Sequence, residues 1–365
     1  MAYNATMLRA VKLSLKFSTP TKLASVVAVL DRYRATVNAY IAHVWKHGGS
    51  LHKATADSVP LGHLTFRQRA HALQQALGIV LATRKSARSI GNAATMPVFR
   101  GAMVLSKQLA EVTESRVRGQ FDLWLRFSTL SPGNRIDIPL KATNPYRKWT
   151  RQPGAILKGG CAIGGRPGRY YAIVWVLIPD SVPKQTGQDL GVDVGINKLL
   201  ATSDGRHYGR NIKLWMNRVR RRKPGSKGKQ RARRARDRYI HETINRLPWH
   251  QTKLIAVEDL KNIKRGKKAG RGKTFRKAVA PWTVSYVMRW LEMKAQENRV
   301  LRVPVNPRGT STTCPVCGHR ASSNRSNEKF ACVSCGHAGD ADTIGSVNIL
   351  NRALGSVSSP SLAAP

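Results

Sequence analysis

Four of the five cysteines lie near the C-terminus, and their spacing is typical of a zinc site. They form two similar CxxCG groups separated by 14 residues, and they are Cys314, Cys317, Cys332 and Cys335. Four thiolates so spaced can surround one Zn²⁺ tetrahedrally, and the glycine after each pair permits the tight turn that aims the sulfurs inward. A pair of redox CxxC sites or a disulfide framework is the alternative, but redox chemistry does not need two similar knuckles. We therefore predict a structural zinc ribbon, with His319 and His337 exposed rather than bound to metal.

Three acidic residues stand where apolar segments would not ordinarily carry a charge. Asp193 interrupts the apolar segment 191–195, Glu258 ends the apolar segment 255–258, and Asp342 opens the last predicted helix. A buried carboxylate is costly unless it is paired or binds a metal. Several carboxylates can hold two Mg²⁺ ions about 3.5–4 Å apart, where one ion activates water and the other stabilises the leaving oxygen in phosphodiester hydrolysis. We therefore predict that Asp193, Glu258 and Asp342 form a catalytic magnesium site.

Each acid also has an ordinary structural interpretation. Asp193 could cap a turn, and Glu258 could be a surface acid beside Asp259. Asp342 could be a helix N-cap with Asp340 as its solvated neighbour. The chain has only 19 acidic residues, however, so three of them in such contexts favour a common site.

The charge of the chain indicates a polyanionic partner. Lys and Arg number 63 against 19 acidic residues, which gives a net charge of +44. Contacts of Lys and Arg with phosphates release counterions and drive binding, so nucleic acid is the expected partner. A membrane partner is not expected, because the charge is spread over the whole chain.

The most basic segment runs from Arg218 to Arg238, with a hinge at 224–226. On a helix its charges would cover nearly every face, so solvation of one face explains them poorly and phosphate contact is predicted. The candidate nucleic-acid-binding residues are Arg220, Arg221, Arg222, Lys223, Lys227, Lys229, Arg231, Arg233 and Arg234.

A second basic tract, residues 261–277, follows Glu258 and is rich in Gly and Lys. It could be a flexible lid beside the acidic site or a disordered loop. The aromatic residues Trp282, Tyr286 and Trp290 come next at helical spacing. They could stack on bases, but we interpret them as core residues.

Apolar patterns predict a β structure interrupted by helices in the N-terminal half. Residues 8–17 alternate like a half-buried strand, and Ser18-Thr19-Pro20 offers a helix start. Helical patterns continue through about residue 115, and strand patterns return at 121–127, 136–138 and 170–178.

The order of elements changes after a short predicted linker at 183–187. We expect strands at 190–196, 199–202, 254–257 and 300–305, a hairpin turn at 204–205, and helices around 282–291 and 342–354. The end of the chain, from residue 355, is rich in Ser, Pro and Ala, and is predicted to be a disordered tail.

Neither a membrane span nor a secretory signal is predicted. The longest apolar run, 170–178, is too short to cross a bilayer, and the N-terminus has no apolar signal core. Cys161 is expected to be a small buried apolar residue. These features fit the reducing cytosol of a prokaryote, and the charge fits association with the nucleoid.

Three motifs together resemble a known family. They are similar to the split RuvC motifs and the inserted zinc ribbon of TnpB, a family of transposon-associated RNA-guided nucleases related to compact type V CRISPR effectors. The three motifs read GVDVGIN, IAVEDL and GTSTTCPVCGHR…FACVSCGHAGDADTIGSVNIL. The similarity covers roughly residues 189–355. By this resemblance Asp193, Glu258 and Asp342 match the catalytic triad. Family members usually read D-x-N-A-A-x-N after the third acid, whereas this chain has Ile344, Gly345 and Ser346 in place of N-A-A.

The resemblance implies an α/β fold with a defined domain order. A wedge-type β-barrel would comprise 1–20 and 116–185, with a helical recognition lobe at 21–115 inserted in it. A RuvC-like, RNase H-like nuclease domain would comprise 189–308 and 339–355, with the zinc ribbon at 309–338 and a tail at 356–365.

The resemblance also implies an RNA-guided DNA endonuclease. A guide RNA would pair with one strand of double-stranded DNA, while the N-terminal lobes read a short flanking motif. A compact type V CRISPR effector would share every motif, and a nuclease-weak RNA-guided repressor would share the fold. A ribosomal-type zinc-ribbon protein that binds RNA would explain the charge and the cysteines, but not the three acids.

Overall fold

The computed structural model describes residues 7–47, 64–90, 93–115, 119–131, 133–179, 182–223, 225–260 and 281–358. The chain divides into two compact units, Met1–Asp180 and Ser181–Pro365, and the division falls just before the predicted linker. The basic tract at 261–277, residue 224 of the predicted hinge and residues 359–365 of the predicted tail lie outside the described residues.

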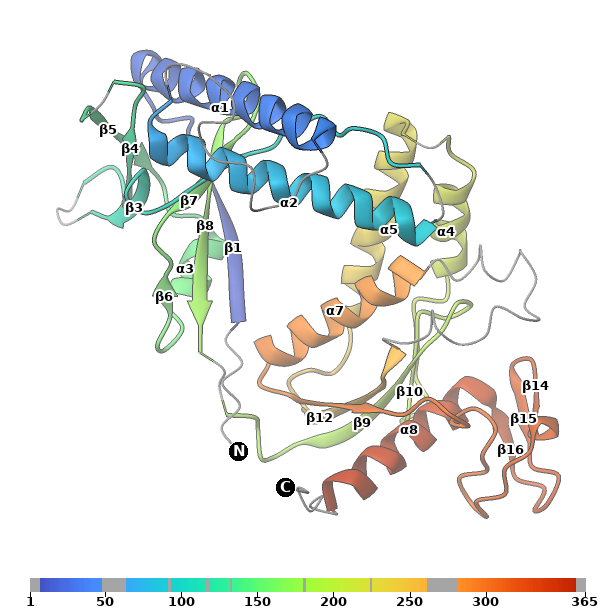
Figure 1. The fold of residues 1–365 in the computed structure, drawn as a ribbon. Helices are drawn as coiled ribbons and strands as arrows, with labels where there is room; N and C mark the ends of the chain where they lie inside the picture. The colour runs from blue at the N-terminus through green and yellow to red at the C-terminus, as the bar shows by residue number, and fades with distance from the viewer. Residues whose placement is uncertain are drawn as a thin grey trace, which may run out of the picture. The chain divides into compact units, whose positions relative to one another are not determined.

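The first unit is built around a five-stranded sheet (Figure 1). Strand β1, Met7–Ser14, pairs antiparallel with β8, Tyr171–Ile178, along its whole length. Its side chains alternate strictly between buried and exposed, as predicted. Strand β7, Cys161–Gly164, continues the sheet, and the buried Cys161 confirms its assignment as an apolar core residue.

Two long helices pack in the same core as this sheet. Helix α1, Pro20–Lys46, begins at the predicted position, where the Thr19 hydroxyl accepts a hydrogen bond of 3.4 Å from the backbone N–H of Lys22. Helix α2, Phe66–Ile90, packs along α1. Tyr33 and Val37 of α1 are fully buried in this core.

The prediction of helix through about residue 115 was wrong. Helix α2 ends at Ile90, and β2, Met103–Leu105, and β3, Ala110–Glu114, follow as strands. Strand β2 joins β7, while β3 belongs to a second, three-stranded sheet. Cross-strand pairing therefore overrides the local helical pattern there. The remaining elements of the unit are β4 (Leu123–Ser128), β5 (Arg135–Leu140), α3 (Asn144–Thr150) and β6 (Ile156–Leu157).

The second unit contains a mixed five-stranded sheet in the order β11-β10-β9-β12-β13. Strand β9 is parallel to β12, and β12 is parallel to β13, whereas β10 and β11 run antiparallel to their neighbours. The strands are β9 (Gln188–Val194), β10 (Leu200–Thr202), β11 (His207–Tyr208), β12 (Thr252–Glu258) and β13 (Leu301–Val305). Strands β9, β10, β12 and β13 lie where the sequence predicts strands, and the predicted hairpin turn connects β10 with β11.

Helices cover both faces of this sheet (Figure 1). Helices α4 (Ile212–Arg220), α5 (Lys227–Asn245) and α7 (Pro281–Glu297) share a core with alternate strand residues such as Val192 and Val257. Helix α8, Ala341–Ser358, packs on the opposite face against residues such as Leu254 and Ala256. Helix α8 extends to Ser358, beyond its predicted end near 354.

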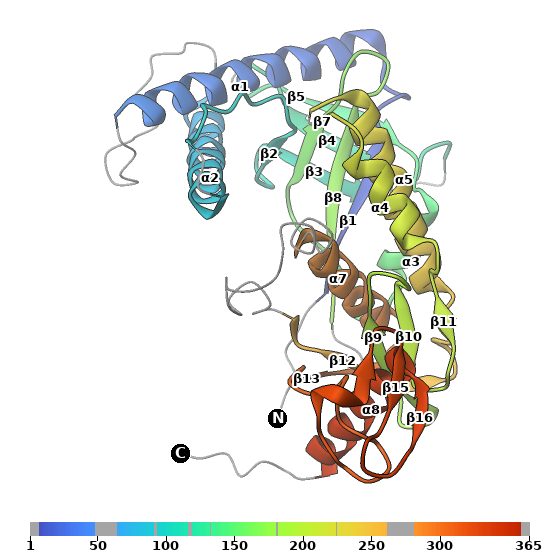
Figure 2. The ribbon, with the colours of Figure 1, turned by 90° about the vertical axis from the view of Figure 1, so that its right-hand side faces the viewer.

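A small three-stranded sheet lies between β13 and α8 in sequence and beside α8 in space (Figure 2). Its strands are β14 (Arg325–Ser326), β15 (Lys329–Ala331) and β16 (Ala338–Asp340), and a short helix, η2 (Ser322–Asn324), precedes them. Phe330 packs with Cys314, Cys332 and the α8 residue Ile344, so the ribbon and the helix share a core. Among the described residues, no helix has the length and apolar character of a membrane span.

Candidate active site

Asp193 and Glu258 lie at the carboxyl ends of adjacent parallel strands. Val192 of β9 is the register partner of Val257 of β12, so the two acids follow matched positions. Because side chains alternate along a strand and both valines belong to the core under α5 and α7, the acids face α8 instead. The sheet therefore brings two carboxylates from distant parts of the sequence to one edge and one face.

Helix α8 supplies the third acid by approaching β9 very closely. A Cβ added to Gly191 would lie 2.0 Å from the carbonyl oxygen of Ser346, so only glycine allows the helix to pack there. At Gly345 a Cβ would lie 3.5 Å from Oδ2 of Asp193. Thus Gly345 lies beside the acid, and the backbone of Ser346 lies against Gly191. Asp342 lies one turn before these residues.

The three carboxylates influence one another electrostatically. Burial, together with the charges of Glu258 and Asp342 and against the charge of Arg325, raises the pKa of Asp193 to about 7. Burial also raises the pKa of Glu258, although a hydrogen bond from Thr310 opposes this. Grouped carboxylates with raised pKa values are typical of sites that bind a cation or perform acid–base chemistry.

Thr310, at the start of the predicted ribbon, binds the second acid. Its hydroxyl donates a hydrogen bond of 2.6 Å to Oε1 of Glu258. Its carbonyl oxygen, and that of Thr313, each accept a hydrogen bond of 2.8 Å from the side-chain amide of Asn348 on α8. The sequence did not assign either role, although Thr310 belongs to the TS-x-x-C motif and Asn348 is the last residue of the family pattern.

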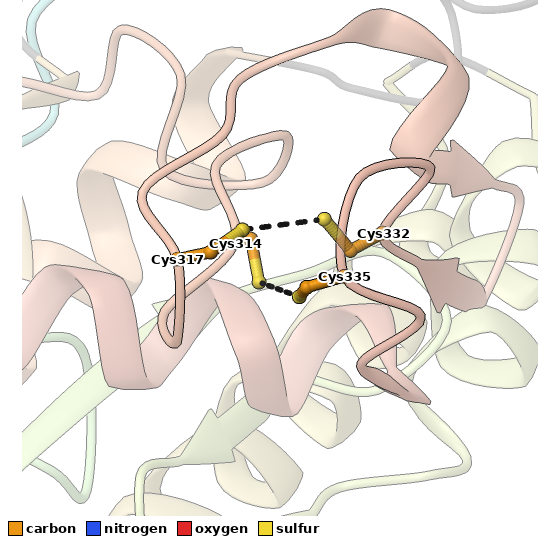
Figure 3. A group of neighbouring side chains, drawn as sticks. All are labelled: Cys314, Cys317, Cys332 and Cys335. Atoms are coloured by element: carbon orange, nitrogen blue, oxygen red, sulfur yellow. Dashed lines mark hydrogen bonds between the residues drawn. The ribbon is translucent and has the colours of Figure 1, made fainter.

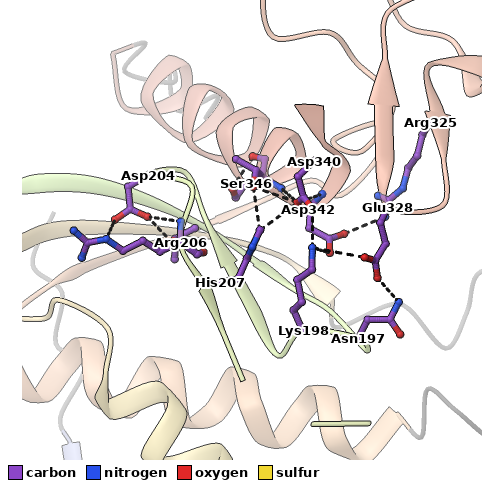
Figure 4. A network of polar contacts seen from close by, with 12 residues as sticks. Asn197, Lys198, Asp204, Arg206, His207, Arg325, Glu328, Asp340, Asp342 and Ser346 are labelled. Atoms are coloured by element: carbon purple, nitrogen blue, oxygen red, sulfur yellow. Dashed lines mark hydrogen bonds and ion pairs between the residues drawn. The ribbon is translucent and has the colours of Figure 1, made fainter. Parts of the chain in front are cut away.

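Two cations contact the third acid. Arg325 of the ribbon donates a hydrogen bond of 3.1 Å to Oδ1 of Asp342, and Nζ of Lys198 lies 3.5 Å from Oδ2 of the same residue. Lys198 also donates a hydrogen bond of 2.7 Å to Asp340 (Figure 4). These cations compensate part of the charge of the acidic site.

The ordinary interpretation of Asp342 as the N-cap of α8 was wrong, because Asp340 has that role. Oδ1 of Asp340 accepts hydrogen bonds from the backbone N–H groups of Asp342 and Thr343. Although burial opposes it, the hydrogen bond from Lys198 lowers the pKa of Asp340 to about 2. His207 of β11 lies 3.2 Å from the same carboxylate, so Asp340 is paired rather than merely solvated (Figure 4).

The four ribbon cysteines converge on one point (Figure 3). Their sulfurs all lie within 4.8 Å of one another, and the Cys314–Cys335 and Cys317–Cys332 pairs are each 3.6 Å apart. Four sulfurs at about 2.3 Å from a tetrahedral Zn²⁺ would be about 3.8 Å apart, so the cluster fits the ion. Backbone N–H groups, chiefly that of Cys335, lower the pKa of Cys332 and favour its thiolate. Although the backbone N–H of His337 opposes it, hydrogen bonds with the neighbouring thiols raise the pKa of Cys335.

The two ribbon histidines are not part of this cluster. His319 is exposed, and His337 is half-buried with its ring centroid 6.5 Å from that of Phe330. Among the described residues, the four cysteines are the group of metal-binding side chains compact enough to enclose an ion. The three acids are neighbours but are not gathered as tightly.

The predicted nucleic-acid-binding residues lie apart from the acids, on a helical hairpin made by α4 and α5 (Figure 2). Most of them are exposed, Lys229 being half-buried. The charges do not lie on one continuous helix, because α4 ends at Arg220 and α5 begins at Lys227. Arg236 is buried and paired with Asp237, so not every charge of the tract is available for phosphate.

The aromatic residues of α7 support the core, as predicted. Tyr286 and Trp290 pack against the core under α5 and α7. The His241 ring lies 3.7 Å from that of Trp290, and its Nε2 lies 2.7 Å from the Tyr286 hydroxyl. The side chain of Trp282 lies outside the described residues.

Comparisons with known proteins give relatives of one kind. A family model described as the TNB domain of Cas12f1-like proteins matches residues 285–349, which extend from α7 through the ribbon into α8. The TnpB-like protein MJ0751 of Methanocaldococcus jannaschii is 29% identical over 135 residues, which cover 36% of this chain and 48% of that relative. The "Putative RNA-guided DNA endonuclease InsQ" of Escherichia coli K12 is 26% identical over 252 residues, covering 60% of this chain and 61% of the relative.

The chain thus spans about half to three fifths of the length of these curated relatives. Among solved structures, the chain is similar to Cas12f1 in its complex with sgRNA and target DNA, with a TM-score of 0.49, 14% identity, and coverage of 95% of this chain and 99% of that chain. The sequence matches confirm the resemblance that the motifs predict, and the chain is therefore a relative of the TnpB-like proteins.

Proposed function

We propose that this chain is an RNA-guided DNA endonuclease that cuts DNA by Mg²⁺-assisted phosphodiester hydrolysis. The observation that carries the proposal is the convergence of Asp193, Glu258 and Asp342 from three separate segments. The effect of Glu258 and Asp342 on the pKa of Asp193 supports their proximity. The name of the relative from Escherichia coli supports the same reaction and the same use of a guide.

The second unit would then be an RNase H-like, RuvC-type nuclease domain. Its strand order supports this assignment, because the three parallel strands β9, β12 and β13 are extended on one side by the antiparallel hairpin of β10 and β11. Residues 309–338 would be the zinc ribbon inserted in it. The first unit would be the wedge-type β-barrel, with the helical recognition lobe contributed by α1 and α2.

The donor set fits magnesium, because carboxylate oxygens are its usual protein ligands and the clustered charges favour a cation. Asp193, Glu258 and Asp342 would hold the ion, which when bound activates water and stabilises the leaving oxygen. Thr310 fixes Glu258 through its hydrogen bond. Lys198 and Arg325 hold Asp342 from either side of the helix start.

Guide RNA and double-stranded target DNA would be the partners. Base pairing would select the sequence, and the protein would contribute charge and recognition of a short flanking motif. The net charge of +44 and the exposed arginines of the α4–α5 hairpin support binding to phosphates.

A compact type V CRISPR effector is the second candidate, because the matching family model describes Cas12f1-like proteins. Sequencing the RNA that co-purifies with the protein separates the two, since a transposon end and a repeat array would supply different guides. A nuclease-weak repressor is less well supported. All three acids are present.

The test is the substitution Asp193→Ala in the full chain with its RNA. Cleavage of a matched DNA target should be abolished, while binding of guide RNA and target DNA stays nearly unchanged. Glu242→Ala is the matched control, because Glu242 is an exposed acid on α5 of the same unit. Equal cleavage by the Asp193 variant and the control would refute the assignment of the site.

A further inference from the structure

We propose that α4 carries a binding site for one unpaired base of RNA, built around the indole of Trp215. The site is a surface cavity of about 360 Å³, and its lining residues all belong to α4 or adjoin its ends: Asn211, Leu214, Trp215, Asn217, Arg218 and Arg221. The inference deepens the proposed function and rests on it for RNA as the partner. It does not depend on cleavage.

Trp215 is an aromatic residue that lies outside the hydrophobic core of the unit. Its neighbour Met216 and the facing Tyr239 pack against the core of the unit, whereas the Trp215 side chain stays half-exposed. The rings of Trp215 and Tyr239 are 5.7 Å apart, and the guanidinium carbon of Arg218 lies 4.9 Å from the indole centroid. Aromatic rings and guanidinium planes are the surfaces on which unpaired RNA bases stack.

Side-chain groups that can form hydrogen bonds with a base line the cavity beside the indole. Asn211 precedes the first turn of α4, but its side chain does not cap the helix. Its backbone N–H donates a hydrogen bond of 3.1 Å to the Tyr239 hydroxyl. Within the described part of the chain, the side-chain amides of Asn211 and Asn217 and the indole N–H of Trp215 have no hydrogen-bond partner. Amide groups can donate to and accept from the edges of a base.

The cavity is also strongly basic. Helix α4 contains no acidic residue, and it leads directly into Arg221, Arg222 and Lys223. No described carboxylate pairs with Arg218 or with any of these three residues. They are therefore available to the phosphates that flank a stacked base.

The position of the cavity in the unit favours RNA over the DNA strand that is cut. Ile212 of α4 belongs to the core on one face of the sheet, together with Ile240 of α5. Asp193 and Glu258 face α8 on the other face. A strand held at Trp215 is therefore separated from the acids by the sheet, which fits a guide that remains bound and uncut.

Photocrosslinking of the unmodified protein tests the inference directly. Single-stranded RNA that carries 5-iodouridine should crosslink to the tryptic peptide 214–218, which contains Trp215, as read by mass spectrometry. The same oligonucleotide as DNA should crosslink less. Crosslinking by DNA alone would overturn the assignment to RNA, and the absence of any adduct on this peptide would overturn the site.

Affinity measurements with matched variants separate stacking from charge. In Mg²⁺-free buffer, Trp215→Ala should weaken binding of single-stranded RNA about 5- to 150-fold with little change in the salt dependence. Trp215→Phe should retain most of the affinity, and Lys213→Gln, on α4 but outside the cavity lining, should bind nearly as the wild type. Unchanged affinity in a folded Trp215→Ala protein would overturn the proposal.

An RNA with abasic positions keeps the test valid if Trp215→Ala does not fold. The wild-type protein should bind this RNA about as weakly as the alanine variant binds normal RNA. Failure of the wild type to bind any RNA would contradict the proposed function itself. Equal binding of abasic and normal RNA contradicts the base site alone.

Discussion

Thr310 donates a 2.6 Å hydrogen bond to Glu258 while its carbonyl oxygen accepts one from Asn348. Glu258 ends β12, Thr310 leads into the ribbon, and Asn348 lies on α8. One buried threonine therefore connects the sheet, the ribbon and the last helix. The position of Glu258 thus depends on the start of the ribbon and on α8, although neither segment contains Asp193 or Glu258.

Replacement of this hydroxyl should weaken the site without removing any acid. Thr310→Val deletes the hydrogen bond that lowers the pKa of Glu258, so this pKa should rise. Loss of an outer-shell partner typically costs about 10- to 100-fold in metal affinity or activity. We expect the cleavage rate to fall by that factor and the Mg²⁺ concentration needed for cleavage to rise. Thr310→Ser keeps the hydroxyl, so it should cleave at nearly the wild-type rate and at the wild-type Mg²⁺ concentration. Equal activity and equal Mg²⁺ dependence in the valine variant would contradict the role of Thr310.

The raised pKa of Asp193 predicts an unusual pH dependence of stability in Mg²⁺-free buffer. The carboxyl has a pKa of about 7 in the folded protein, above its ordinary value of 3.8. Between these two pH values the folded state binds more protons than the unfolded state. The contribution of Asp193 to the free energy of unfolding therefore decreases as the pH rises from about 4 to 7. Asp193→Asn should flatten this decrease. Melting temperatures across this pH range measure it.

Magnesium should reverse this loss above pH 7, because an ion that binds only the folded state stabilises it. The melting temperature of the wild type should rise with Mg²⁺ concentration, and that of Asp193→Asn should not. An equal rise in both proteins would show that the ion binds elsewhere.

Removal of one ribbon cysteine should lower zinc content and stability together. Cys317→Ser leaves three thiolates, and structural zinc contributes directly to the folding free energy. We expect less than one zinc ion per chain and a lower melting temperature. Cys161→Ser is the control, because this buried thiol lies in the first unit and should lower stability with zinc unchanged. Normal zinc stoichiometry in Cys317→Ser would rule out the four-cysteine site.

Gly191 should tolerate no side chain. In Gly191→Ala the new Cβ would meet the Ser346 carbonyl at 2.0 Å, so α8 must move away from β9. Overpacking of this kind typically costs about 1–3 kcal/mol, and the shift would also displace Asp342. We expect a lower melting temperature and reduced cleavage. Gly228→Ala on α5, where the nearest atoms are 3.8 Å away, should leave both unchanged or raise stability slightly.

Local patterns in the sequence predicted the elements that are stabilised locally. The alternation of β1, the Thr19 cap and the hairpin at Gly205 follow from neighbouring residues, and each was found where expected. The short strands β2 and β3 were missed, because Leu105 and Val112 become strand residues only through pairing with β7 and β4.

The same distinction applies to the candidate site. Acids that interrupt apolar strands and paired CxxC groups are visible in the sequence, because their cost or chemistry is intrinsic to the residue. The roles of Thr310, Lys198 and Asp340 are not visible, since a threonine or a lysine is unremarkable until the fold gives it a carboxylate neighbour. The exclusion of Arg236 from the basic surface likewise depends on its burial against α7.

The close contact between Gly191 and α8 has a consequence for the order in which the protein is made. A ribosome delivers β9 and β12 before the ribbon, and the ribbon before α8. During synthesis Asp193 and Glu258 therefore stand on a sheet whose covering helix does not yet exist. The third carboxylate joins them only when α8 emerges and settles on Gly191, so a half-made chain lacks the complete acidic cluster.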